Sequence, residues 1–402
     1  VLDVSTETDP LEAGPGAELA GGRFIYLRRL GAGSTAVAIL VEDRQVGGSQ
    51  RVLKVARDAE AAERLRAEAT VLARSENDDR IVTLHDVVDV GGRTALLLKY
   101  AGRTTLAEEL NNRRRLSIDV LQRWGTDLLT ALVALERNGV THRDIKPSNL
   151  AVFQANSRAD THLVMFDFSM AGVDAKDIEA GTPPYLDPFL GVGGRRQFDT
   201  AAERYGAAVV LFEMATGTTP HYGPDPGAHP ATVDADVNLD PGMFEATIAE
   251  AMVGFFAAAL SRDATKRPDT AEDMLRDWQR AFTASTPAAA PQASDEAAAG
   301  ADATTPLAAA GLTARAVSAL AGAQVTTVGE LLALDSTLLN RLVAREGKET
   351  RKEITARYRD WAKRLGRQRR PVGAEELMRL DDAVELLMAT VAGRAATRRD
   401  AA

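Results

Sequence analysis

Apolar and polar residues alternate along the first hundred residues in the pattern of short β-strands. Three such runs, RFIYLRRL, TAVAILVED and QRVLKVA, are separated by glycine-rich or polar turns, as expected of an antiparallel sheet. A helix, AEAAERLRAEATVLARS, is predicted next and ends at the turn-forming residues ENDD. Two more strands are predicted over residues 81–90 and 93–100.

After residue 105 the spacing of apolar residues becomes that of helices. The segment LQRWGTDLLTALVALERNG has apolar residues at positions 121, 124, 128, 132 and 135, which is the 3.6-residue period of a helix. A small sheet with one helix, followed by a larger helical part, predicts an α+β fold of two lobes with a cleft between them. We expect the N-lobe over residues 22–100 and the C-lobe over residues 101–283.

The remaining segments predict a second, smaller domain. Residues 284–305 consist mainly of Ala, Pro, Ser and Thr and hold no large apolar residue, which predicts a flexible linker. Residues 1–21 are likewise expected to be a flexible N-terminal segment. Residues 306–366 contain four short amphipathic stretches and predict a small all-α domain. Residues 367–402 predict a C-terminal helix that begins a further element.

Composition limits the classes of protein. The 402-residue chain is 45% hydrophobic and 26% charged and holds no cysteine, which excludes disulfides, thiolate zinc sites and cysteine nucleophiles. No apolar run approaches the roughly 20 residues that span a bilayer, and the first 22 residues lack the features of a signal peptide. We therefore expect a cytoplasmic protein without membrane contact, and a chain beginning at Val1 is expected to belong to a longer protein.

The net charge of −9 is unevenly spread, because residues 306–402 carry 17 Lys and Arg against 12 Asp and Glu. This split predicts two parts with different partners. Nothing in the sequence predicts an oligomeric state.

Candidate chemistry begins at a glycine-rich turn. LGAGSTAVAIL places Gly31 and Gly33 between two predicted strands, where backbone N–H groups could approach phosphates closely. The turn alone is equally typical of a plain hairpin, since Ala36 stands where a third glycine is common. Lys54 on the third strand and Glu68 on the next helix could form an ion pair that holds a phosphate.

The stretch THRDIKPSNLAVF, residues 141–153, is either a solvated charged turn or the loop of a phosphotransfer site. Which of the two it is depends on whether the rest of the chain supplies the partners that such a loop needs. Asp144 can accept a hydroxyl proton, Lys146 can neutralise a phosphate, and Asn149 can ligate magnesium. Asp167, at the end of the apolar strand HLVMFDFS, supplies an anionic magnesium ligand. With Lys54 and Glu68, these residues occur in the order and spacing that a triphosphate site needs.

Residues 22–283 therefore resemble a eukaryotic-type serine/threonine protein kinase, on H-R-D-I-K-P-S-N above all. The resemblance implies a two-lobed kinase fold, ATP with Mg²⁺ or Mn²⁺, and a protein substrate with a Ser or Thr hydroxyl. The catalytic residues it implies are Asp144, Lys146, Lys54 and Glu68, and the metal ligands are Asn149 and Asp167. The nucleotide-binding residues it implies are Gly31, Ala32, Gly33, Ser34, Lys54, Leu98, Lys99, Tyr100 and Ala101.

The chain departs from this family at three scaffolding positions. Ser169 replaces the glycine of D-F-G, Phe189 replaces the glutamate of A-P-E although its partner arginine is present as Arg267, and Glu203 replaces an aspartate. Two alternatives remain: an ATP-binding pseudokinase scaffold, and a small-molecule kinase, which ought to lack the segment GTPPY. Arg143, which clamps an activation-segment phosphate in many kinases, is expected to pair here with acidic side chains, namely those of Asp174, Asp177 and Glu179.

Two narrower resemblances complete the analysis. GSTAVAIL, DFS and GTPPYLDPF resemble the kinase component of bacterial phage-growth-limitation (Pgl, BREX-like) defence systems. Residues 306–366 resemble the helix-hairpin-helix C-terminal domain of RNA polymerase α subunits. This second resemblance implies phosphate contacts by Gly347, Lys348, Arg351 and Lys352. Because glutamates interleave with these bases, docking of a partner protein is favoured over contact with DNA.

Overall fold

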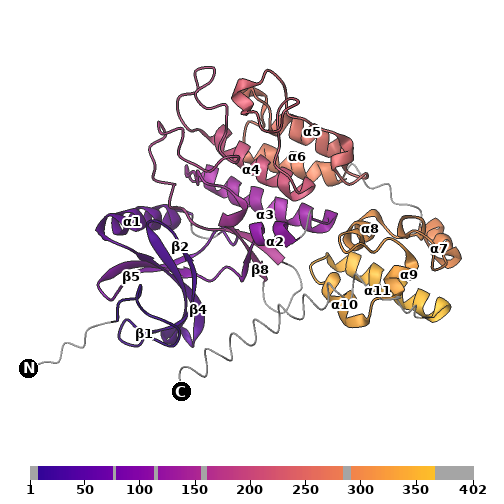
Figure 1. Ribbon diagram of the computed structural model, residues 1–402, viewed down its shortest axis with the longest axis horizontal. Helices are drawn as coiled ribbons and strands as arrows, with labels where there is room; N and C mark the ends of the chain where they lie inside the picture. The colour runs from indigo at the N-terminus through magenta and orange to yellow at the C-terminus, as the bar shows by residue number, and fades with distance from the viewer. Residues whose placement is uncertain (1–7, 76–77, 113–115, 155–160, 284–290, 367–402) are drawn as a thin grey trace, which may run out of the picture.

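A computed structural model describes residues 8–75, 78–112, 116–154, 161–283 and 291–366. These residues form two lobes and a third, all-helical domain (Figure 1). The N-lobe carries the larger sheet and one long helix, and the C-lobe is mostly helical. The α+β class agrees with the pattern of apolar residues, and the last strand of the N-lobe sheet ends at Lys99.

The N-lobe sheet has the strand order β1-β2-β3-β4-β6-β5, with every neighbouring pair antiparallel. Its strands are β1 (Glu18–Leu19), β2 (Phe24–Ala32), β3 (Ala36–Asp43), β4 (Ser49–Ala56), β5 (Leu84–Val90) and β6 (Arg93–Lys99). Helix α1 (Ala59–Arg74) packs on β4, β5 and β6. It begins where the Asp58 carboxylate accepts a hydrogen bond from the Ala61 N–H at 2.8 Å, a typical N-cap.

The N-terminal segment differs from the expected flexible stretch over residues 1–21. From residue 8 onward it lies on the N-lobe, and β1 pairs with β2. Leu19 is fully buried beside Phe24, in an apolar cluster that Leu11 and Ala17 partly cover. The few apolar residues of this acidic segment therefore pack on one face of the sheet. Composition alone does not reveal this packing, because it does not show which surface those residues meet. Residues 1–7 lie outside the described part of the chain.

The C-lobe is built around the long helix α3 (Ile118–Arg137). The other helices of this lobe are α2 (Leu106–Asn112), α4 (Thr200–Thr216), α5 (Ala249–Ala259) and α6 (Ala271–Thr283), and a small sheet holds β7 (Thr104–Thr105), β8 (Leu150–Gln154) and β9 (Thr161–Met165). Gly125 of α3 lies against the Trp278 ring of α6, where any side chain would collide with the indole. This close approach brings α3 and α6 together over buried Trp124 and Trp278.

The helical domain has a core of its own, separate from the two lobes. Its helices are α7 (Pro291–Gly300), α8 (Ala314–Ala321), α9 (Val328–Leu332), α10 (Ser336–Leu342) and α11 (Lys348–Leu365). Trp361 is buried there, and its indole N–H donates to the Ala298 carbonyl at 2.9 Å.

Helix α7 occupies part of the linker predicted over residues 284–305. Ala298 and Ala301 are buried in the second core, so small side chains pack closely where the sequence offered no large apolar residue. Alanine also has the highest intrinsic helix propensity. Residues 284–290, and the C-terminal helix predicted over residues 367–402, lie outside the described residues.

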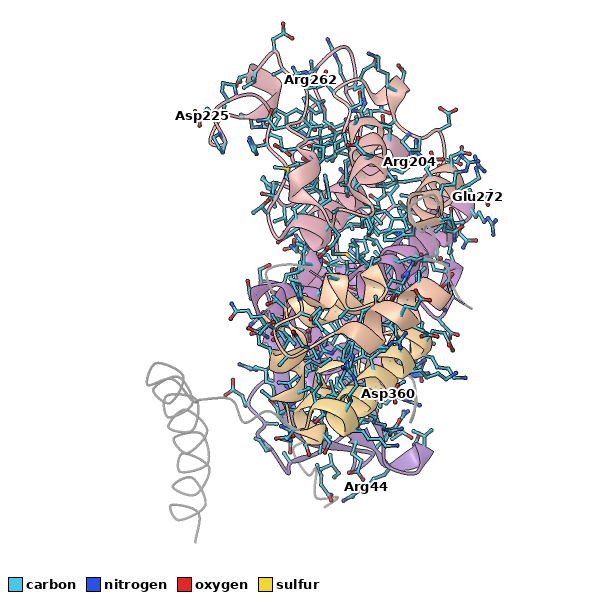
Figure 2. All side chains as sticks on the ribbon, turned by 90° about the vertical axis from the view of Figure 1, so that its right-hand side faces the viewer. Arg44, Arg204, Asp225, Arg262, Glu272 and Asp360 are labelled. Carbon is cyan, nitrogen blue, oxygen red and sulfur yellow. The ribbon has the colours of Figure 1, made fainter. Side chains whose placement is uncertain are left out.

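The helical domain lies against α2 and α3 of the C-lobe (Figure 1). In Figure 2 Asp360 of α11 faces the viewer, below Arg204 of α4. Gly347, predicted to contact a phosphate, donates its N–H to the Asp119 carboxylate of α3 at 3.1 Å. Within the segment VTTVGELL, residues 325–332, Thr327 and Glu330 form a capping box that begins α9. Among the residues that the structure describes, no helix has the length and apolar character needed to cross a membrane.

Candidate active site

The two lobes enclose a cavity of about 420 Å³. All but one of the predicted nucleotide-binding residues line this cavity: Gly31, Gly33, Ser34, Lys54, Leu98, Lys99, Tyr100 and Ala101. The exception is Ala32, which does not line it. Val52, Val82 and Ala151 add apolar wall that sequence reasoning missed. A strand residue that faces a cavity has the same apolar pattern as one that faces a core, so no signal distinguished them.

The glycines of the β2–β3 hairpin are not required by the fold. A Cβ added at Gly31 would meet no atom within 4 Å, and one at Gly33 would make an ordinary contact of 3.7 Å. Neither residue has a positive φ. The missing side chains therefore leave room over the cavity, which favours close approach of a ligand to the backbone. Arg57 holds this hairpin in place, since its Nε donates to the Gly33 carbonyl at 2.8 Å.

Lys54 lies between two carboxylates at the back of the cavity. Its Nζ is 2.6 Å from Glu68 Oε2 and 2.7 Å from Asp167 Oδ1, and the Glu68 side chain is 1% exposed. Burial lowers the pKa of the Lys54 ammonium, but the two carboxylates outweigh it and the net pKa is raised. The Lys54 side chain therefore stays protonated and positively charged at ordinary pH values, as a residue that anchors a phosphate must.

Asp167 remains ionised for the same reason. Burial raises the pKa of its carboxyl, but the Lys54 ammonium offsets this and lowers the pKa from 3.8 to about 2. The backbone of Asp167 has a φ of 66°, which is unusual for a non-glycine residue and typical of functional sites. The next residue, Phe168, is buried and donates its N–H to Glu68 at 3.1 Å, so Asp167 and Glu68 are held together.

Three polar side chains contact Asp144, two from its own loop 142–149 and one from Thr182. Thr182 Oγ1 donates to Asp144 Oδ1 at 2.6 Å, and Lys146 Nζ lies 2.7 Å from Asp144 Oδ2. Lys146 also donates to Thr182 at 2.8 Å. Asn149, in the short 3₁₀ helix Pro147–Asn149, donates its amide to Asp144 Oδ2 at 3.1 Å. The Asp144 carboxylate is therefore held in one orientation.

Asn149 and Asp167 are suited to hold a divalent cation. The Asn149 amide nitrogen is used by Asp144, which leaves its oxygen as the ligand atom. Asp167 gives one oxygen to Lys54 and its side chain is 37% exposed toward the cavity it lines. A carboxylate and an amide oxygen are the hard ligands that Mg²⁺ takes beside phosphate oxygens.

A buried acid supports the loop from below. Glu203 of α4 accepts hydrogen bonds from the His142 N–H at 2.5 Å and the Arg143 N–H at 3.1 Å. Burial raises the pKa of Glu203 to about 7. The two N–H bonds lower the pKa, but they offset only part of the effect of burial. His142 is fully buried, 4.6 Å from the Phe168 ring. Glutamate in place of aspartate therefore still reaches the loop backbone.

Arg143 binds the activation segment through carbonyl oxygens. Its guanidinium donates to the carbonyls of Val173 at 2.6 Å, Asp174 at 2.8 Å and Asp177 at 2.6 Å, and it lies over the Phe198 ring. The prediction that Arg143 pairs with the side chains of Asp174, Asp177 and Glu179 is thus wrong, because Arg143 donates to backbone carbonyl oxygens instead. The Asp174 carboxylate instead accepts from the Lys176 N–H at 2.9 Å. Backbone carbonyls are closer to the guanidinium because the short segment folds around it.

The ion pair expected of A-P-E is present in another form. Arg267 pairs with Asp187, at 2.6 Å, and Arg195 pairs with the same carboxylate at 2.7 Å. Sequence reasoning noted that Phe189 replaces the glutamate, and missed that Asp187 supplies the acid two residues earlier. The signal was the Asp in L-D-P-F, an acid next to an otherwise apolar turn.

Comparison with known proteins finds the same organisation elsewhere. Residues 24–278 match the protein kinase domain family. The probable kinase PglW of Streptomyces coelicolor is 37% identical over 319 residues, which make up 69% of this chain and 20% of that protein.

Two further relatives are serine/threonine-protein kinases. Pkn2 of Myxococcus xanthus is 26% identical over 280 residues, 65% of this chain and 32% of that protein. PksC of Streptomyces coelicolor is 27% identical over 306 residues, 71% of this chain and 54% of that protein. The chain thus spans between a fifth and about half of the length of these relatives.

Proposed function

This chain belongs to the protein kinase family, with a domain of the serine/threonine kind, and we propose that it transfers the γ-phosphoryl group of ATP to a Ser or Thr hydroxyl of a protein. The arrangement around Asp144 carries the proposal. Its carboxylate is held by Thr182, Lys146 and Asn149, and Lys54 and Asp167 lie across the cavity. These two groups of charged and polar side chains are the ones that phosphoryl transfer requires, which supports the proposal.

Each side chain has a step in this reaction. The substrate hydroxyl gives its proton to Asp144 as its oxygen bonds to the γ-phosphorus, and the bond to the β-phosphate oxygen breaks to release ADP. Lys146 neutralises the transferring group, and Lys54 holds the phosphates. A divalent cation, which we propose to be Mg²⁺ with Mn²⁺ as a substitute, neutralises charge on the phosphate oxygens. Asn149 and Asp167 would hold it.

The substrate class follows from the Thr182 contacts. Thr182 belongs to the segment GTPPY, and it contacts both Asp144 and Lys146. A protein hydroxyl that enters beside this segment meets the base directly, which favours a protein substrate over a small molecule. A pseudokinase scaffold would retain the cavity without the base and its Lys146 partner, and both are present.

The wider role is proposed from likeness to PglW. With the residues GSTAVAIL and GTPPYLDPF, that likeness supports a kinase acting in a phage-growth-limitation system, as one part of a longer protein. Such a kinase would use the ATP of the cytoplasm. Of the two partners predicted for residues 306–366, a protein is favoured over DNA, since Gly347 contacts a carboxylate of the C-lobe.

The test is transfer of labelled phosphate. Purified chain is mixed with γ-labelled ATP and Mg²⁺ or Mn²⁺, with a basic carrier protein and with lysate as substrates, and the labelled amino acid is identified. We expect phosphoserine or phosphothreonine, with none in Asp144→Asn. Asp360→Asn, a change on an exposed face of α11, is the matched control. A wild-type chain that binds ATP and never transfers phosphate would establish the pseudokinase alternative.

A further inference from the structure

The helical domain, residues 291–366, is fastened to the first turn of α3. Arg315 of α8 donates to Asp119 at 2.5 Å and to Gln122 at 2.6 Å. Ser318 accepts from the Ile118 N–H at 3.2 Å, which satisfies a backbone donor that a helix N-terminus leaves open. Ser117, which caps α3, also donates across this interface, to Glu346 at 2.8 Å. The contact is therefore specific in its partners.

The same interface reaches α2 through one residue. Arg345, between α10 and α11, forms an ion pair with Glu109 of α2. The Glu109 side chain is 5% exposed, so Arg345 supplies most of the compensation that a buried carboxylate needs. Arg123 of α3 independently fixes the main chain at this point, because it donates to the Arg345 carbonyl at 2.5 Å.

Glu109 is also bonded to the wall of the nucleotide cavity. Its second oxygen accepts from the Thr104 hydroxyl at 3.2 Å, and Thr104 lines the cavity. The preceding residue, Glu108, lines the cavity as well and accepts from the Thr105 N–H at 2.8 Å. Successive residues on a helix point about 100° apart. The short helix α2 thus presents Glu108 to the cavity and Glu109 to the helical domain.

We propose that Arg345 is a positioning residue for nucleotide binding, and that docking of the helical domain sets ATP affinity through Glu109, Thr104 and α2. The proposal rests on the proposed function for the identity of the ligand. With Arg345 in place, Glu109 holds Thr104 and the start of α2 against the cavity. Without Arg345, Glu109 is a buried carboxylate that lacks its cation. The carboxylate then moves into solvent and α2 rotates with it, which displaces Glu108 and Thr104 from the cavity. Because such coupling is reciprocal, bound ATP also tightens the domain on the C-lobe.

The test measures nucleotide affinity directly in the full chain, by calorimetric titration of ATP and Mg²⁺. We expect Arg345→Met to weaken binding at least about fivefold, the lower range of coupling between sites. In the transfer assay KM for ATP rises by the same factor, and the turnover at saturating ATP stays near wild type. Arg345→Lys, which keeps a cation beside Glu109, restores most of the affinity. Arg359→Met, on an exposed position of α11, is the matched control and leaves affinity unchanged.

A double-mutant cycle distinguishes positioning from general loosening. If Arg345 acts through Glu109, Arg345→Met in a Glu109→Gln background changes affinity by less than about twofold, because the two residues are coupled and the first mutation has already removed the interaction. Wild-type ATP affinity in Arg345→Met overturns the inference and leaves the proposed transfer intact. An equal loss in both backgrounds also overturns it, because the effect would then bypass α2. Failure of transfer with normal ATP binding contradicts the proposed function alone.

Discussion

Asp187 lies 2.6 Å from Arg267, and both side chains are fully buried in the C-lobe. The pair joins the end of the activation segment to the loop before α6. Phe189, which stands where the family has the acid, packs edge-on against Tyr205 and Tyr222. The acid thus lies two residues earlier in the same turn, and the connection between the two segments is retained.

The first prediction concerns this pair. Asp187→Ala leaves Arg267 buried without its carboxylate, and the free energy of unfolding should fall by about 3–5 kcal/mol. Urea denaturation measures it. Phe189→Glu, which restores the residue common in the family, should also destabilise the chain, because the new carboxylate enters an aromatic cluster. A chain stabilised by Phe189→Glu would contradict the assignment of Asp187.

The second prediction concerns the base. Asp144→Asn should slow phosphoryl transfer by about 10²–10⁴-fold, the range for losing a positioned general base, with ATP affinity little changed. Single-turnover kinetics separate the chemical step from binding. Turnover like that of the wild type would remove Asp144 from the mechanism.

The third prediction concerns Lys54. A lysine in a solvent-filled cleft would be expected to contribute little to the stability of the fold, but Glu68 is buried beside Lys54. Lys54→Met should therefore abolish transfer and also lower the free energy of unfolding by about 3 kcal/mol, as expected for a buried charge without its partner. Lys54→Met with Glu68→Gln should recover much of that stability and none of the activity. Thermal unfolding and the transfer assay give the two readouts.

The fourth prediction concerns activation. The segment 167–188 has three hydroxyl-bearing residues, and each is engaged: Ser169 with Asp167, Thr182 with Asp144, and Tyr185 with Glu213. Since Nη1 and Nη2 of Arg143 already donate to carbonyls of this segment, phosphatase treatment should leave activity unchanged. Replacing Asp174, Asp177 and Glu179 by Asn, Asn and Gln should have little effect, whereas Arg143→Met should lower activity strongly. Loss of activity on dephosphorylation, with the phosphate mapped to this segment, would refute the prediction.

The fifth prediction concerns pH. Burial raises the pKa of Glu203 from 4.5 to about 7, so the native state holds a proton that the unfolded chain releases between these values. This contribution to stability is complete below pH 4.5 and is lost as pH rises through 7. It amounts to about 3 kcal/mol. Glu203→Gln should remove this part of the pH dependence in denaturation curves taken from pH 4.5 to 8. An unchanged pH profile in that variant would show that another group is responsible.

Sequence reasoning predicted the N-lobe strands well because each alternates clearly and ends at a glycine or an acidic turn. From H-R-D-I-K-P-S-N it also predicted Asp144, Lys146 and Asn149 as site residues, and the structure brings these side chains into contact. Phosphate roles for Lys54, Asp144 and Asn149 remain predictions that the geometry supports.

Other features were beyond the reach of a single sequence. Helix α7 packs through alanines, whose burial depends on the surface opposite them. Asp187 replaces a missing acid through a contact with a residue 80 positions away. The docking of the helical domain involves pairs such as Arg345 and Glu109, and nothing local in either segment indicates the other.

The three tryptophans of the chain are divided between the C-lobe and the helical domain. Trp124 and Trp278 are buried around α3, and Trp361 is buried over α7; each indole donates to a backbone carbonyl. Intrinsic fluorescence therefore reports on both parts at once. A chain that keeps only Trp361 would emit from the helical domain alone, so an optical signal could follow that domain while it separates from the lobe beside it.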